Sequence, residues 1–357
     1  MRKWSLLVLV CSIVLLIVGC GSKKEETNNT AAAGNNTTAN TSSNAGDTET
    51  PAEKSYKIAI SQIVEHPSLD ATREGFLAAL KDAGIEEGKN LTVDFNNAQG
   101  DSSNNLSIAQ KIAAEKNDLV LAIATPSAQA VVQQVKDTPV LFAAVTDPLS
   151  AKIVSNLDAP GGNVSGASDT NPAATTQLVD FIAANFPNVK TVGVVINEGE
   201  ENAVVMAKMA EDELSKHNIK LVKAAVTNTS EVKQAAESLV GRADALYITL
   251  DNMVVSGVDS IIQVAQKNKI PFFSSDRDTV EKGAFATVGF KYYDHGYQVG
   301  QMAAEVLKNG KKVGDLKVSM QEKLDLILNL KAAKALGITV TDDMKKAVQD
   351  QAQNIIQ

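Results

Sequence analysis

Polar side chains recur just after the apolar runs of this 357-residue chain, and their types suit the binding of a small charged molecule. Thr125 and Ser127 supply hydroxyl groups at the start of a predicted helix, where unpaired backbone N–H groups favour an anion. Carboxylate and amide side chains follow other runs and suit a cation such as an ammonium group. The candidate ligand-binding residues are Ser61, Gln62, His66, Thr125, Ser127, Thr146, Asp147, Asp169, Asn197, Glu201, Asn202, Asp251, Asn252 and Asp276.

Each candidate also has an ordinary structural explanation. Pro126 beside Ser127 is typical of the first turn of a helix, and Asp, Asn and Ser residues commonly form turns and helix caps. Their repetition at the same position after successive apolar runs is harder to explain by turn formation alone. The pattern as a whole therefore indicates a binding site at one edge of a sheet.

The apolar runs predict short buried strands, and the segments between them predict amphipathic helices, which is the pattern of parallel α/β layers. The segment 56–80 shows this plan most fully. Its apolar run Ile58–Ile60 predicts a strand, and a polar loop follows. The next helix starts near Ser68, which can cap it, and stops near Gly84. The loop lies at the carboxyl end of the strand, where open α/β sheets bind ligands.

The same patterns continue along the chain as two consecutive series. The predicted strands span 58–60, 91–95, 119–123 and 140–145, and then 192–196, 221–226, 245–250, 271–273 and 284–288. Helices are predicted to begin near 68, 103 and 127, and then near 175, 202, 231, 254 and 276. A further helix at 292–308 and the tail at 325–335 have no partner left in the second series, and we interpret them as return crossings.

The turn-rich segment Asp158–Asn163 interrupts the alternation, and we place the first crossing between two lobes just after it. A body of about 300 residues also suits two domains better than one. The predicted fold class is therefore α/β, with two Rossmann-like lobes that contain parallel sheets and are joined by several hinge crossings. The first lobe is predicted to comprise 56–166 plus about 290–314, and the second 167–289 plus about 315–357.

The first residues indicate an export signal that is not part of the fold. Met1–Lys3 carry positive charge, Leu6–Val18 form an apolar run, and a small residue precedes Cys20 as in the bacterial lipobox. The apolar run is short for a membrane span, which needs about 20 residues. We therefore predict a signal peptide at 1–19, lipid on Cys20, and a disordered Asn- and Thr-rich tether at 20–54. The protein is expected on the extracytoplasmic face of the cell membrane, held by its lipid.

Charge and cysteine content argue against several other classes. The chain has 34 basic and 42 acidic residues, and loss of Arg2 and Lys3 with the signal lowers the formal charge from −8 to −10. This acidic balance disfavours a nucleic-acid partner. Cys11 and Cys20 are the only cysteines and the first leaves with the signal, so neither a disulfide framework nor a cysteine metal site is expected. No cofactor is predicted.

Several stretches of sequence together resemble one known family. They are VEHPSLDA at 64–71, ATPSAQ at 124–129, TDP at 146–148, APGGNVSG at 159–166, LDN at 250–252, VGFKYY at 288–293 and NLKAAKALG at 329–337. The chain is similar to the substrate-binding lipoproteins of ABC transporters, in particular the tryptophan- and tyrosine-binding lipoproteins. The resemblance implies a type I periplasmic-binding-protein fold, an amino acid-like ligand between the lobes, and a membrane permease as partner. We also expect a monomer.

Other functions stay open on the sequence alone. A nucleoside or sugar ligand is the first alternative, although the only tryptophan, Trp4, lies in the signal and few rings are left to stack on a ligand. A secreted hydrolase is the weaker alternative. His66 lies near Ser61 and two acidic residues, but no G-x-S-x-G, metal-spaced histidine or phosphate-loop motif accompanies them. A DNA-binding repressor with two lobes is disfavoured by the export signal and the negative charge.

The remaining histidines and rings give weaker guidance. We expect His217 and His295 to lie on the surface, because both are placed near the ends of polar helices. The rings available to a ligand are Phe142, Phe290, Tyr292 and Tyr293.

The ligand roles follow from the strand-end pattern taken together with the resemblance. We expect Thr125 and Ser127 to hold the carboxylate of a zwitterion, and Asp251 to hold its ammonium group, with Asp147 and Glu201 as rivals. Asp251 ends a strand of the opposite lobe, so the ligand is expected to bridge the lobes and favour a closed form.

The lipobox interpretation predicts the outcome of one substitution. Cys20→Ala should abolish lipidation, because the thiol is the only acceptor for the lipid, and should leave ligand binding by the folded body unchanged. Metabolic labelling with a tagged fatty acid measures the first effect, and a binding titration measures the second. A labelled Cys20→Ala protein would contradict the assignment.

Overall fold

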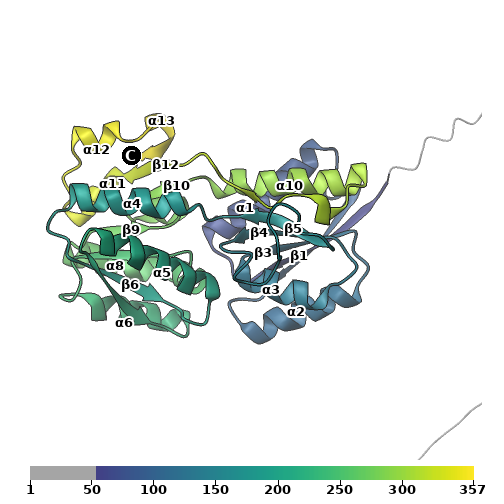
Figure 1. Cartoon of the computed structure of the whole chain (residues 1–357), viewed down its shortest axis with the longest axis horizontal. Coiled ribbons are helices and arrows are strands. Elements are labelled where there is room, and N and C mark those ends of the chain that lie inside the picture. Colours follow the sequence, from purple (N-terminus) through teal and green to yellow (C-terminus); the bar gives the residue numbers. More distant parts are fainter. Residues whose placement is uncertain (1–53) are drawn as a thin grey trace, which may run out of the picture. The chain divides into compact units, whose positions relative to one another are not determined.

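Two β-sheets carry the fold of residues 54–357, which are the residues described by this computed structural model (Figure 1). The predicted signal peptide, Cys20 and the tether up to residue 53 lie outside the described residues. Within 54–357, no helix combines the length and the apolar character needed to cross a membrane. We call each sheet with its covering helices a lobe.

The first lobe has a parallel sheet with strand order β11-β5-β4-β3-β1-β2. Its strands are β1 Tyr56–Gln62, β2 Leu91–Asn97, β3 Leu119–Ile123, β4 Val140–Val145, β5 Val164–Ser168 and β11 Ser319–Met320. Its helices are α1 Pro67–Asp82, α2 Ser102–Ala114, α3 Thr125–Gln134 and α10 Tyr292–Asn309. Every residue of β3 is buried because α1 and α10 cover one face of the sheet while α2 and α3 cover the other.

The second lobe has strand order β13-β12-β10-β9-β8-β6-β7, and only the β10–β12 pair is antiparallel. Its strands are β6 Thr191–Ile196, β7 Lys220–Ala225, β8 Ala245–Ile248, β9 Phe272–Ser274, β10 Ala286–Gly289, β12 Asp325–Asn329 and β13 Ile355–Ile356. Its helices are α4 Pro172–Asn185, α5 Glu201–Lys216, α6 Val232–Leu239, α7 Asn252–Ser256, α8 Val258–Asn268, α9 Arg277–Lys282, α11 Leu330–Leu336, α12 Asp342–Lys346 and α13 Gln351–Asn354. Phe273 and Phe285 pack at 6.0 Å between ring centroids in its core.

The chain passes between the two sheets three times, at 169–171, 290–291 and 321–324. Side-chain hydrogen bonds tie these crossings together. The Tyr292 hydroxyl donates to Asp169 Oδ2 at 3.0 Å, and the Asn171 amide donates to the Gln321 carbonyl at 3.2 Å. The predicted α/β fold with two parallel-sheet lobes and several crossings is confirmed.

Some predicted boundaries differ from the structure. The sequence placed 167–168 and 319–320 in the second lobe, but β5 and β11 add them to the first sheet. The two-residue strand β11 is too short to leave a periodic pattern. The helix at 292–308 is not itself a crossing: α10 packs along α1 in the first lobe, and only the residues before it cross.

Helix starts also differ, and one difference concerns the site. Ser68 does not cap α1, since the helix already begins at Pro67, a residue suited to the first position because its nitrogen carries no hydrogen. His66 occupies the capping position and makes no side-chain capping bond. Ser61 and Gln62, predicted in the loop, belong to β1, because the strand continues beyond its apolar run.

Glycines allow α1 and α10 to pack with their backbones in direct contact. A Cβ atom on Gly75 would lie 2.0 Å from the Tyr293 carbonyl oxygen, and one on Gly296 would lie 1.9 Å from the Thr72 carbonyl oxygen. Neither distance is possible for real atoms. The close packing fixes the start of α10, and therefore the crossing before it, against the start of α1.

We predict that Gly296→Ala lowers the free energy of unfolding by about 1–3 kcal/mol, because the added methyl group forces the two backbones apart. The better helix propensity of alanine offsets this by only about 1 kcal/mol. Denaturant titration measures the change. Gln301→Ala on the exposed side of α10 is the control and should change stability by less than about 0.5 kcal/mol. Equal stability of the two variants would contradict the packing argument.

Candidate functional site

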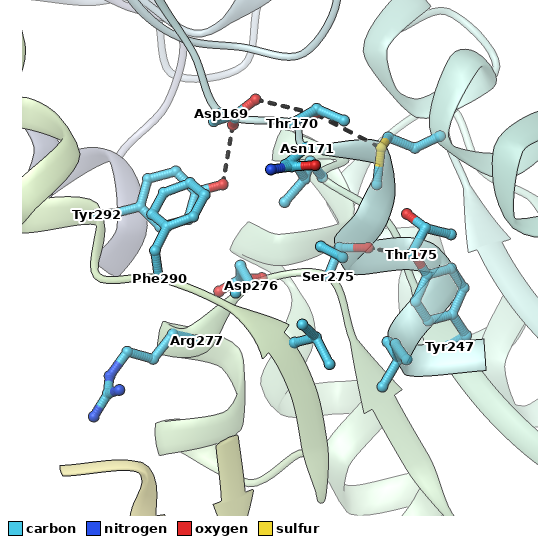
Figure 2. Close-up of a pocket in the computed structure, with 16 residues that line it drawn as sticks. Asp169, Thr170, Asn171, Thr175, Tyr247, Ser275, Asp276, Arg277, Phe290 and Tyr292 are labelled. Carbon is cyan, nitrogen blue, oxygen red and sulfur yellow. Dashed lines mark hydrogen bonds between the residues drawn. The ribbon is translucent and has the colours of Figure 1, made fainter. Parts of the chain in front are cut away.

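A cavity lies between the first and second crossings and the second sheet (Figure 2). It encloses about 440 Å³ of space between its lining atoms, its opening included. A second cavity of about 300 Å³, measured in the same way, reaches to the start of α1 in the first lobe. Asp169, Leu250, Asp276 and Tyr292 line both cavities, so the two adjoin. The pair forms one candidate site between the lobes.

Asp169 contributes a buried carboxyl group to both cavities from the first crossing. The Tyr292 hydroxyl donates to it at 3.0 Å, and the Thr170 hydroxyl donates at 3.4 Å. Burial raises the pKa of Asp169 to about 6, although these hydrogen bonds oppose the rise. The carboxyl group is therefore ionised only part of the time in mildly acidic solution and would gain from a cationic partner.

Asp276 supplies a second buried carboxyl group, just before α9. The Thr279 backbone N–H donates to Oδ1 and the Thr279 hydroxyl donates to Oδ2, both at 2.8 Å, so the residue caps its helix. The Ser68 hydroxyl donates to Oδ1 at 3.1 Å from the first lobe. These donors are all neutral and leave the negative charge of Asp276 without a cation.

Arg277 follows Asp276 but turns away from it (Figure 2). Its guanidinium donates to Glu281 at 2.7 Å, to the Gln353 carbonyl at 2.7 Å, and to the Asn354 side chain. Among residues 54–357, no lysine or arginine forms an ion pair with Asp169 or Asp276. The site therefore offers negative charge to a ligand.

His66 closes the second cavity from the first lobe. The ring is buried, its Nε2 lies 3.5 Å from Asn252 Oδ1 of the second lobe, and its Nδ1 has no partner among the described residues. Burial lowers the pKa of His66, while the charge of Asp276 opposes the change. Asn202 presents a buried Oδ1 that also lacks a partner. Such unpaired atoms leave hydrogen-bonding capacity for a ligand.

The cavities bring together some of the residues predicted from sequence, and these come from both lobes and the first crossing. They are His66, Thr146, Asp169, Asn202, Asn252 and Asp276. The other candidates line neither cavity. They are Ser61, Gln62, Thr125, Ser127, Asp147, Asn197, Glu201 and Asp251. The part that each residue plays in binding stays a prediction.

The hydroxyl groups at the start of α3 are engaged inside the first lobe. The Thr125 hydroxyl accepts the Thr146 backbone N–H at 3.4 Å, and the Ser127 hydroxyl donates to Asn105 at 3.4 Å. Both residues are buried. Thr125 thus contacts the second cavity only through Thr146, which lines it.

Three polar candidates form hydrogen bonds away from the two cavities. Asp147 closes an exposed turn by accepting the Ser150 hydroxyl at 2.7 Å. Asn197 accepts the backbone N–H of Gly199 at 2.9 Å. The Glu201 carboxylate accepts the Gln129 amide at 3.1 Å across the lobes, in an exposed position.

Asp251 is buried but engaged as a helix cap. Its carboxyl group accepts the Val254 backbone N–H at 3.0 Å and the Asn197 backbone N–H at 2.6 Å. Burial, followed by the charge of Glu200, raises the pKa of Asp251 well above its usual range. The geometry gives Asp251 a structural role in positioning α7.

Sequence reasoning missed several residues of the site. Glu200 is buried, and its carboxylate accepts the Asn252 amide at 2.6 Å and the Asn202 amide at 3.0 Å, so it orients both side chains. Its neighbour Glu201 was the residue predicted to bind ligand, and the polar cluster at the predicted helix start was the available signal. Tyr247, inside an apolar strand, gave no signal.

His295 is not on the surface, and that expectation was wrong. The side chain is fully buried under Phe290 and Tyr292, and its Nε2 accepts the Ala144 backbone N–H at 3.0 Å. His295 faces inward because α10 lies on the sheet. His217 is exposed as predicted, 2.8 Å from Asp180.

Only two of the four aromatic residues predicted to be available to a ligand line a cavity. Phe290 and Tyr292 line the first cavity, whereas Phe142 is buried in the core between the sheet, α2 and α3, and Tyr293 is 41% exposed.

A family model described as "ABC transporter substrate binding protein" matches residues 57–352. The chain belongs to this family. The substrate-binding protein is 41% identical over 313 residues to a tyrosine-binding protein of Clostridioides difficile strain R20291, which covers 87% of this chain and 88% of that one. It is 42% identical to a conserved domain protein of Vibrio cholerae of known structure, with a TM-score of 0.79, covering 83% and 99% of the two chains.

Two other solved structures are similar to this chain. The complex of a Streptococcus pneumoniae ABC domain with L-Trp is 34% identical, covers 83% of this chain and 99% of that chain, and superposes with a TM-score of 0.78. The ligand-free, open structure of a substrate-binding protein with adhesive properties from Clostridium difficile is 40% identical, covers 84% and 98%, and superposes with a TM-score of only 0.62. In the structure of this chain the two lobes touch through the Ser68–Asp276 and Gln129–Glu201 hydrogen bonds.

The buried histidine predicts how stability depends on pH. Burial lowers the pKa of His295 to about 4, below its ordinary value of 6.5. Above pH 6.5 both folded and unfolded states are neutral at this residue, and as the pH falls toward 4 only the unfolded state takes up the proton. The free energy of unfolding should therefore fall by about 3 kcal/mol over this range from this residue.

Asp169 and Asp278 have raised pKa values of about 6 and about 7 and contribute in the opposite direction. The test therefore compares denaturant titrations of the wild type and His295→Gln at several pH values. The difference between the two curves should shrink or reverse from pH 7 to pH 4. A difference that is constant with pH would show that His295 does not titrate in this way.

Proposed function

We propose that this substrate-binding protein captures an L-amino acid with an aromatic side chain between its lobes and delivers it to an ABC permease. The observation that carries the proposal is the pair of buried carboxyl groups, Asp169 and Asp276, facing one cavity without a lysine or arginine partner in the described chain. An ammonium group is the ligand cation that fits a small site with two carboxylates and nearby neutral acceptors.

The ligand carboxylate is assigned to the start of α1. Ser68 and Leu69 line the second cavity, and their N–H groups in the first turn have no acceptor within the helix. The 16-residue helix has no side-chain cap, and its dipole favours an anion at this end. Thr125 and Ser127, the residues expected from sequence to hold the carboxylate, remain the rival assignment, although they line neither cavity.

The aromatic side chain is assigned to the first cavity. Phe290 and Tyr292, with ring centroids 5.3 Å apart, stand on one side of it, and Leu178 and Val288 add apolar surface. The names of similar proteins support this class of ligand, since one is a tyrosine-binding protein and another binds L-Trp. A glucose-galactose binding protein and a 5-methylthioribose complex of known structure are each 17% identical to this chain and show the fold alone.

The cellular setting follows from the family and the first residues. Substrate-binding proteins of ABC importers work outside the cytoplasm. We infer that Cys20 carries lipid and that 20–54 tethers a monomeric body to the membrane, close to the permease that receives the ligand.

The ammonium assignment predicts that Asp169→Asn and Asp276→Asn each weaken binding of L-tyrosine or L-tryptophan by about 2–5 kcal/mol, because each removes a buried ionic partner. Calorimetric titration measures the affinity, and a melting curve verifies folding.

Asp251→Asn is the matched control. Asparagine keeps the cap to the Val254 backbone N–H through its Oδ1, whereas its NH₂ group cannot accept the Asn197 backbone N–H. The melting temperature should therefore fall, while the affinity of the folded protein stays close to that of the wild type. A large loss with Asp251→Asn and none with the other two variants would return the ammonium to Asp251, as the sequence suggested. No binding of any amino acid by the wild type would reject the proposed function.

A further inference from the structure

One end of the first cavity is built from hydroxyl groups. Figure 2 shows Thr175 of α4, Tyr247 of β8 and Ser275 of the loop after β9 together, away from Asp169 and Tyr292. All three lie in the second lobe, and the Ser275 backbone N–H donates to the Ile248 carbonyl at 3.0 Å, which fixes its loop to the end of β8. We call these three residues the hydroxyl end.

The hydroxyl end retains unused hydrogen-bonding capacity. The Tyr247 and Ser275 hydroxyl groups bond to each other, and since one hydrogen serves that bond, the other remains for a further acceptor. Burial raises the pKa of Tyr247 to about 12, so its phenol keeps its proton. Thr175 is only 5% exposed and lines the cavity, and its hydroxyl has no hydrogen-bond partner within residues 54–357.

The wall that leads to the hydroxyl end is apolar. Ala174 and Leu178 of α4, Met206 of α5 and Val288 of β10 line the cavity with the hydroxyl end. An apolar passage that ends in a few polar groups is the usual form of a site that accepts a ring carrying a polar atom.

We propose that Thr175, Tyr247 and Ser275 bind the phenol hydroxyl of a tyrosine side chain and make the site select tyrosine over phenylalanine. The inference rests on the proposed function and names the ligand within that class. A phenol both donates and accepts, so it can accept the spare hydrogen of the Tyr247–Ser275 pair and donate to Thr175.

The side chains of phenylalanine and tryptophan would satisfy fewer hydrogen-bonding groups of the hydroxyl end than that of tyrosine. Phenylalanine would leave buried hydroxyl groups without partners, and sites built around a ligand hydroxyl discriminate strongly against such an analogue. An indole N–H only donates, so tryptophan would leave the spare hydrogen of the Tyr247–Ser275 pair unused. Tyrosine is the aromatic amino acid that satisfies both demands.

The test is calorimetric titration of the purified protein with L-tyrosine, L-phenylalanine and L-tryptophan. The wild type should bind tyrosine about 10- to 100-fold more tightly than phenylalanine. Tyr247→Phe and Thr175→Val should each reduce that ratio about tenfold by weakening tyrosine binding, with phenylalanine affinity nearly unchanged. Melting curves verify folding of each variant, and Thr175→Val keeps the test decisive should Tyr247→Phe fail to fold.

Thr249→Val is the matched control, because Thr249 is a fully buried hydroxyl residue beside β8 that lines neither cavity. It should preserve the tyrosine-to-phenylalanine ratio. Equal wild-type affinity for tyrosine and phenylalanine, tighter binding of tryptophan, or an unchanged ratio in both folded variants would overturn the hydroxyl-end assignment while leaving amino-acid binding intact. No binding of any of the three amino acids would instead reject the proposed function itself.

Discussion

Asp169 and Asp276 are buried beside one cavity with no lysine or arginine paired to them in the described chain, and the arrangement of the site depends on this charge. Burying a carboxylate is costly unless donors or a cation replace its water. Tyr292 and Ser68 replace part of it, with hydrogen bonds of 3.0 and 3.1 Å. Because Ser68 lies in the first lobe and Asp276 in the second, one of these hydrogen bonds joins the two lobes.

The packing of α1 on α10 positions the groups of the first lobe that reach these carboxyl groups. Gly75 and Gly296 bring the two backbones together, so the first residues of both helices are fixed relative to each other. The start of α1 carries His66 and Ser68, and the start of α10 carries Tyr292. One rigid helix pair therefore presents the closing contacts and the donor to Asp169.

The C-terminal segment helps to keep the site negatively charged, because it binds the arginine that follows Asp276. Arg277 is adjacent to Asp276 in sequence and would neutralise it if it turned inward. Its guanidinium instead donates hydrogen bonds to Glu281, Gln353 and Asn354, so it does not pair with Asp276. A C-terminal segment with no contact to the cavities thus contributes to their electrostatics.

The sequence by itself determined the alternation of strands and helices. It placed β3 and β4 at their observed residues, because apolar runs bounded by polar segments leave few other structures. It also located the polar residues at the strand ends. Only the tertiary structure decided which of them face the cavity. Asp251 and Asp276 look alike in sequence and both cap helices, yet only Asp276 lines the cavity, while His295 is buried because α10 returns to the first sheet. Capping a helix and binding a ligand use the same residue types, so the distinction depends on how distant segments pack.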